Sequence, residues 1–249
     1  MVGQGYDGAA AMSGHKNGVQ KHIQDECPSA VYTHCVSHSL NLCLMKAGEV
    51  PDINKAVTLM HEIAVFYNDS NKRLLNLESA IKQECSQSSH ARLKLHCTTR
   101  WGERQEAVRI FKELMPAIKT SLADIGLWPG CLGKASLFSS ALDDSGFLVA
   151  LEVLTAVLEV TKPLSVKLQA VSQDIHNAMK SVQDCVTVLQ QMRTEEKFFH
   201  DLFIRAEEEN GDNIQKPRTA RRQRHRENHP ADTPEEFYRR SVFLILMFA

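Results

Sequence analysis

Apolar residues recur every three to four positions after Pro51, and this spacing constrains the fold more than any other feature of the chain. Four such runs can be followed: Ile53–Tyr67, Val108–Ile125, Phe147–Thr161 and Ile175–Leu189. This is the period of amphipathic α-helices that bury one face. The sequence therefore predicts a mostly helical region over residues 51–205. A loop at Trp128–Gly133 interrupts it, and Pro163 is expected to start or kink a helix.

Residues 1–50 have a different pattern. Met1–Tyr6 and Ala30–His34 are short β-prone segments, and Ser13–Glu26 between them is predicted to be a helix. Pro28 should end that helix, and a second helical pattern follows Cys35. A strand-helix-strand-helix order favours a parallel strand pair. The expected fold class is therefore α/β followed by all-α.

The segment 206–232 is strongly charged and almost free of apolar residues. An acidic run precedes a basic one, and the residues concerned are Glu207, Glu208, Glu209, Asp212, Lys216, Arg218, Arg221, Arg222, Arg224 and Arg226. Such composition is typical of a disordered connector. The last segment, 233–249, should open with a short helix capped by Thr233.

Composition limits the function classes. The chain has 249 residues, of which 43% are hydrophobic and 24% charged, so it can build a core. The net charge of −1 gives no overall attraction to nucleic acid, so such binding would need a local basic patch. Seven cysteines without a secretory leader favour reduced thiols in the cytosol or nucleus. No apolar run reaches the roughly 20 residues that span a membrane, so we expect no membrane partner.

Asp7 is the first candidate functional residue. It lies between Gly5 and Gly8, where the first predicted strand ends and a helix is about to begin. An acid at a strand end can hold a divalent metal ion together with other carboxylates. The alternative is that Asp7 forms a turn or caps the next helix.

Three motifs occur in a fixed order along the chain. They are Gly3–Ala9, Tyr32–Leu42 with its Cys35-x-x-His38 core, and Thr98–Trp101. In their order and in the identity of their residues, these motifs resemble those of the hAT superfamily of DNA transposases, in particular its domesticated members. The resemblance covers almost the whole chain, and the Cys-x-x-His-Ser-Leu-Asn-Leu run is its most specific part.

The resemblance implies an RNase H-like core that a long helical insertion interrupts. Residues 1–50 would then be a partial core, and 51–205 the insertion. The charged linker would occupy 206–232, and 233–249 would begin a truncated C-terminal region.

The resemblance also implies roles for single residues. Asp7 would be the second acid of an Asp-Asp-Glu triad, and Cys35 and His38 the Cys-x-x-His motif beside it. Trp101 would be the tryptophan associated with a flipped base at the cleaved DNA end. Intact members bind Mg²⁺, and two-metal chemistry needs several carboxylates. One Asp cannot hold two metals, so we expect a vestigial site, no cofactor in this fragment and no transposase activity.

The other acids of the triad have no assigned place. The first would precede residue 1, and the third would follow the insertion. Glu235 and Glu236 lie near the end of the chain, but in a segment that resembles the approach to the family's C-terminal dimerisation region.

Each remaining candidate has an ordinary structural alternative. Cys35 and His38 could be packing residues or half of a zinc site, although the nearby Cys27, His34 and Cys43 do not match a known zinc spacing. Trp101 could be a core anchor instead of a base-stacking residue.

The basic run that contains Arg221, Arg222 and Arg224 is equally open to two interpretations. It could bind DNA or direct nuclear import, or it could be a solvated linker whose charges offset the acids before it.

Together these patterns predict a domesticated or truncated hAT-type protein in the nucleus, with DNA or protein partners or self-association. Two alternatives are kept. The chain could be a helical protein-interaction scaffold, or a fragment of an active, metal-dependent DNA transposase.

Overall fold

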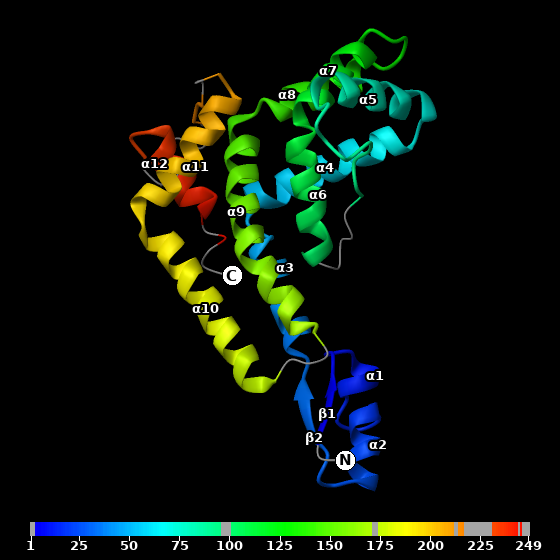
Figure 1. Ribbon diagram of the computed structural model, residues 1–249, viewed down its shortest axis with the longest axis vertical. Coiled ribbons are helices and arrows are strands. Elements are labelled where there is room, and N and C mark those ends of the chain that lie inside the picture. Colours follow the sequence, from blue (N-terminus) through cyan, green and yellow to red (C-terminus); the bar gives the residue numbers. More distant parts are fainter. Residues whose placement is uncertain are drawn as a thin grey trace, which may run out of the picture.

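The chain is mostly helical and carries one small parallel sheet (Figure 1). The computed structural model describes residues 3–95, 101–170, 174–211, 214–216, 231–243 and 245, without the side chains of 101–103 and 175. Within these parts, no helix combines the length and apolar character that crossing a membrane requires.

The expected order of a strand-helix-strand-helix unit followed by helices is confirmed. The elements are β1 (Gly3–Tyr6), α1 (Ala10–Ser13), α2 (Val19–Glu26), β2 (Val31–His34), α3 (Val36–Ala47), α4 (Pro51–Asn68), α5 (Asn71–Glu84), α6 (Trp101–Glu113), α7 (Met115–Gly126), α8 (Leu132–Leu142), α9 (Ser145–Leu168), α10 (Ile175–Thr194), α11 (Glu196–Glu209) and α12 (Pro234–Ser241). Two strands alone do not define an RNase H-like core, which stays a prediction.

Helix α9 is the centre of the helical body (Figure 1). Helices α4, α6, α10 and α11 all pack against it. Its buried residues include Val149, Ala150, Val153 and Val157, which lie on more than one side of the helix. A helix that is apolar on all sides is typical of a protein interior.

Pro163 does not start a new helix, so that part of the expectation was wrong. It lies inside α9, which continues to Leu168. Proline removes one intrahelical hydrogen bond. Pro163 itself is exposed, so it lies on the solvent side of α9 while Leu164 next to it is buried.

The C-terminal segment belongs to the same core as the helices before it. Tyr238, Val242, Phe243 and Ile245 are buried in one cluster that begins at Leu44 and runs through the helical body. Helix α12 packs on α11. Its predicted cap is confirmed, since Thr233 Oγ1 accepts a hydrogen bond from the Glu236 amide at 3.1 Å.

Helix α11 reaches into the range 206–232 that was predicted to be a linker. Helix α11 continues to Glu209, and Ala206 is fully buried within it. Residues 217–230, which carry most of the basic run, lie outside the described part of the chain.

The N-terminal unit, residues 3–35, extends from one end of the helical body (Figure 1). Its strands pair in parallel, with Gly3 opposite Val31 and Tyr6 opposite His34, as the sequence predicted. The predicted helix over 13–26 is wrong in its first half, because α2 begins at Val19.

Two glycines with extended backbone, Gly14 and Gly18, separate α1 from α2 and lie in close contact. The Gly18 amide donates to the Gly14 carbonyl at 3.1 Å, and a Cβ on Gly18 would lie 2.4 Å from the Gly14 nitrogen. The chain therefore turns between α1 and α2 where a continuous helix was expected.

Glutamines fill the interior of the N-terminal unit. Gln4 and Gln20 are buried, and Gln4 Nε2 donates to the carbonyls of Gln20 (3.1 Å) and Ala30 (3.0 Å). Gln20 Nε2 in turn donates to the Ser13 carbonyl at 2.6 Å. Hydrogen bonds thus join both strands and both helices of a unit that has little apolar surface to bury.

Candidate functional site

The candidate site lies at the carboxyl ends of the two parallel strands. Asp7 follows β1 and Cys35 follows β2, so the parallel register places both at the same edge of the sheet. The Cys35 amide donates to the Tyr6 carbonyl at 2.9 Å, which continues the pairing one step past the strands. In open α/β sheets this edge is the usual place for a ligand.

The Asp7 carboxylate is exposed and holds a turn. Its Oδ1 accepts a hydrogen bond from the Ala9 amide at 3.1 Å, directly before α1. This is the local bond with which Asp commonly stabilises a turn. The geometry therefore fits the turn-forming alternative for Asp7.

Aromatic and histidine rings surround the strand ends. The Tyr32 hydroxyl lies 3.2 Å from His34 Nδ1, and the rings of His34 and His38 are 5.6 Å apart. The Tyr32 hydroxyl also donates to the Asp7 carbonyl at 3.5 Å. A Cβ on Gly8 would lie 3.0 Å from His34 Cε1, so the glycine lets the ring approach the Asp7 turn.

Sequence reasoning gave Tyr32 no role and His34 only a minor one as a possible zinc neighbour. The signal that could have found them is period 2 in the strand. It places Tyr32 and His34 on one face of β2, and His38 follows one helical turn later.

The Cys-x-x-His motif spans the start of α3. Cys35 is the residue before that helix and His38 lies in its first turn, and both are half-buried. Cys43 is exposed farther along α3. Cys27 lies before β2, where the Ser29 hydroxyl at 3.4 Å lowers the pKa of its thiol.

No metal ligand set is assembled here. In the described ranges, no three His, Cys, Asp or Glu side chains are grouped so that they could hold a metal ion. The residues described therefore do not fit the Mg²⁺ site that the resemblance implies for intact relatives. They do not form the alternative zinc site either.

The two C-terminal acids have other contacts. Glu235 lies 3.2 Å from His200 Nδ1, and Glu236 accepts from the Asp232 amide at 2.9 Å. Both are on α12, which lies at the opposite end of the molecule from β1 (Figure 1). They do not join Asp7 in one site.

The other predicted site residues are only partly described. Trp101 is the first residue of α6, but its side chain lies outside the described part. Arg221, Arg222 and Arg224 also lie outside it.

Known proteins show a distant similarity to this chain. The human 52 kDa repressor of the inhibitor of the protein kinase is 27% identical over 210 residues, which is 81% of this chain and 28% of the relative. The mouse protein of the same name is 28% identical over 211 residues. This chain is a distant relative of a protein named as a repressor. It spans little more than a quarter of that relative's length.

No family model matches the chain, and no solved structure gives a significant match. The resemblance to the hAT superfamily therefore rests on the three motifs.

Proposed function

We propose that this chain is a transposase-derived binding module of a nuclear regulatory protein and does not itself cleave DNA. The observation that carries the proposal is the Asp7 carboxylate, which is exposed and bonded to the Ala9 amide. Similarity to a protein named as a repressor supports a regulatory role. The order of the three motifs supports a transposase origin.

The helical body supports a binding role. One buried cluster joins helices from α3 to α12, so the surfaces of these helices are held in fixed positions. A rigid surface loses less conformational entropy on binding than a flexible one. DNA and protein partners are both compatible with such a body.

We expect neither the unchanged chain nor the Asp7→Ala variant to cleave DNA. Supercoiled plasmid incubated with the chain and Mg²⁺ or Mn²⁺ should remain intact with both proteins. The replacement removes one exposed turn bond, which costs about 0.5–1 kcal/mol of stability. Plasmid nicking by the unchanged chain that disappears in Asp7→Ala would refute the proposal.

A second candidate role is DNA binding by the Arg221–Arg224 segment. Lys216 Nζ donates to the carbonyls of Ala231 (2.7 Å) and Asp232 (3.0 Å). The residues on both sides of the basic run are therefore held together on the helical body. This contact supports the second role because it fixes the described residues that flank the arginines.

Replacing Arg221, Arg222 and Arg224 with alanine is expected to weaken binding of a DNA duplex about tenfold at low salt. Each lost phosphate contact should also reduce the slope of log K against log salt by about 0.9. Fluorescence anisotropy across a salt series measures both. Alanine at the described, exposed arginines Arg92, Arg109 and Arg193 gives a control with the same change in charge. Equal affinities for the two triple variants would exclude this role.

A further inference from the structure

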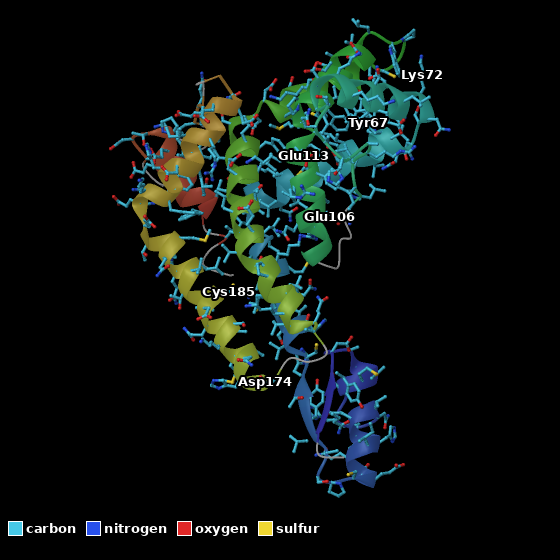
Figure 2. The ribbon with its side chains drawn as sticks, viewed as in Figure 1. Tyr67, Lys72, Glu106, Glu113, Asp174 and Cys185 are labelled. Carbon is cyan, nitrogen blue, oxygen red and sulfur yellow. The ribbon has the colours of Figure 1, made fainter. Side chains whose placement is uncertain are left out.

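The end of the helical body formed by α5, α7 and α8 exposes several leucines. Figure 2 shows Lys72 at this end, far from Asp174. Leu127 is 86% exposed and Leu132 is 65% exposed, both in or beside the α7–α8 loop. Leu75 on α5 and Leu137 on α8 are also largely exposed. Single exposed leucines are ordinary, but a group of them marks a candidate interaction surface.

Three cations lie on aromatic rings at the same end. Lys72 Nζ is 4.1 Å from the centre of the Trp128 ring, and Arg73 Cζ is 4.1 Å from that of Phe66. Lys134 Nζ is 5.7 Å from the Phe66 ring. Among the described residues, none of the three forms an ion pair with a carboxylate. Lys112 and Lys119, by contrast, pair with Glu152 and Asp143.

These residues lie at one end of the helical body. Arg73 at the start of α5 and Lys134 near the start of α8 both reach the Phe66 ring. Helix α7 packs against both α5 and α8. Lys72 precedes Arg73 and covers Trp128, which follows Leu127. We call Lys72, Arg73, Leu127, Trp128, Leu132 and Lys134 the leucine–cation surface.

We propose that the leucine–cation surface docks an acidic, leucine-bearing helix of a partner protein. The leucines would bury the apolar face of that helix, and its Asp and Glu side chains would face Lys72, Arg73 and Lys134. An amphipathic helix presents these two kinds of residue on adjoining faces. Cations that have no carboxylate partner in the described part of the chain, beside exposed leucines, complement such a helix in both respects.

Nucleic acid fits this surface less well. Binding single strands uses exposed aromatic faces on which bases stack, and Lys72 covers the face of Trp128. Exposed leucines add nothing to the contact with a phosphate backbone. The proposal rests on the binding-module role but not on the inactivity of Asp7 or on the Arg221–Arg224 segment. Its failure would leave those two proposals standing.

The test uses the full chain and a fluorescein-labelled synthetic helical peptide. Its leucines are placed at positions i, i+3, i+4 and i+7, with glutamates on the adjoining face. We expect binding by anisotropy that weakens with salt. Lys72→Glu with Lys134→Glu, and separately Leu127→Ser with Leu132→Ser, should each weaken it at least about tenfold.

A matched control lies elsewhere on the body. Val166 on α9 is 62% exposed and is followed by Lys167, so Val166→Ser with Lys167→Glu makes the same kinds of change. This variant should bind the peptide as the unchanged chain does. Unfolding curves check that all variants fold.

Four outcomes would overturn the proposal. The first is that the peptide does not bind, and the second is that the control variant weakens binding as much as the surface variants do. The third is equal binding of a peptide with lysines in place of the glutamates. The fourth is binding of a single-stranded oligonucleotide through Lys72 and Lys134 without binding of the acidic peptide, which would assign the surface to nucleic acid.

Discussion

Replacing both Lys112 and Arg205 with methionine is expected to lower the free energy of unfolding by about 3–5 kcal/mol. Both cations bind Glu152, which lies on α9 and is only 3% exposed. Lys112 Nζ on α6 is 2.5 Å from Glu152 Oε1, and Arg205 Nε on α11 is 3.1 Å from Oε2. Without them a carboxylate would remain inside the helical body with neither cation beside it. Denaturant unfolding followed by circular dichroism measures the loss.

Adding Glu152→Met to this double variant should restore most of the lost stability. The reason is that the cost of the double variant comes from the buried charge and not from the missing contacts. Apolar replacement of a complete buried ion cluster is often neutral or stabilising. A triple variant no more stable than the double variant would contradict this explanation.

A surface ion pair on α6, the helix that carries Lys112, provides the control. Arg109 Nη1 lies 3.2 Å from Glu113 on α6, and both side chains are partly exposed. Exposed pairs contribute about 0–1 kcal/mol, so Arg109→Met should have a small effect. Both replacements remove one cation from α6, but only Lys112 has a buried partner. A larger loss of unfolding free energy for Lys112 would therefore come from the burial of Glu152.

The apolar period predicted the helices well because burial of one face is a local sequence property. The runs at Ile53–Tyr67 and Ile175–Leu189 became α4 and α10, and Thr233 capped its helix as its type predicts. The parallel strand pair also followed from local patterns.

Polar burial was much harder to predict. Gln4 and Gln20 have no sequence signal of their own, since their burial depends on carbonyls of Ser13 and Ala30 that only the fold brings near. Glu152 did leave a signal, because it is the one charged residue between Phe147 and Leu158. A lone acid in such a run predicts either that this side of the helix faces solvent or that the acid has a buried partner. Sequence spacing does not show that Lys112 and Arg205 are the partners of Glu152.

Strand order predicted where Asp7 and Cys35 lie in the fold, but not which groups contact them, and their roles stay predictions. The parallel pair places Asp7 and Cys35 at one edge, which follows from strand order. The bond from the Ala9 amide to Asp7 and the approach of His34 to Gly8 depend on the exact path of a short turn. Motif spacing carries no information about that path.

Replacing Tyr238 with alanine is expected to cost about 3–5 kcal/mol, as for other fully buried aromatic residues. Tyr238 lies on α12 and is 2% exposed, within the same cluster as the helices before it. Burial raises the pKa of its hydroxyl, which donates to the Gln215 carbonyl at 2.9 Å. The residue therefore joins Gln215, which precedes the 216–231 segment, to α12, which follows it.

Tyr238→Phe isolates the hydroxyl and should cost about 1 kcal/mol, since the ring stays while one hydrogen bond is lost. Because α12 shares its core with α9 and α11, both variants should still unfold in a single transition. Circular dichroism and intrinsic fluorescence should then give coincident unfolding curves.

If instead Tyr238→Ala leaves the main transition in place while a protease removes the segment after residue 216, the C-terminal segment would be a separate unit. A large stability loss for Tyr238→Ala beside a small one for Tyr238→Phe would show that the ring holds α12 in the common core. The two variants thus test whether α12 folds together with the other helices.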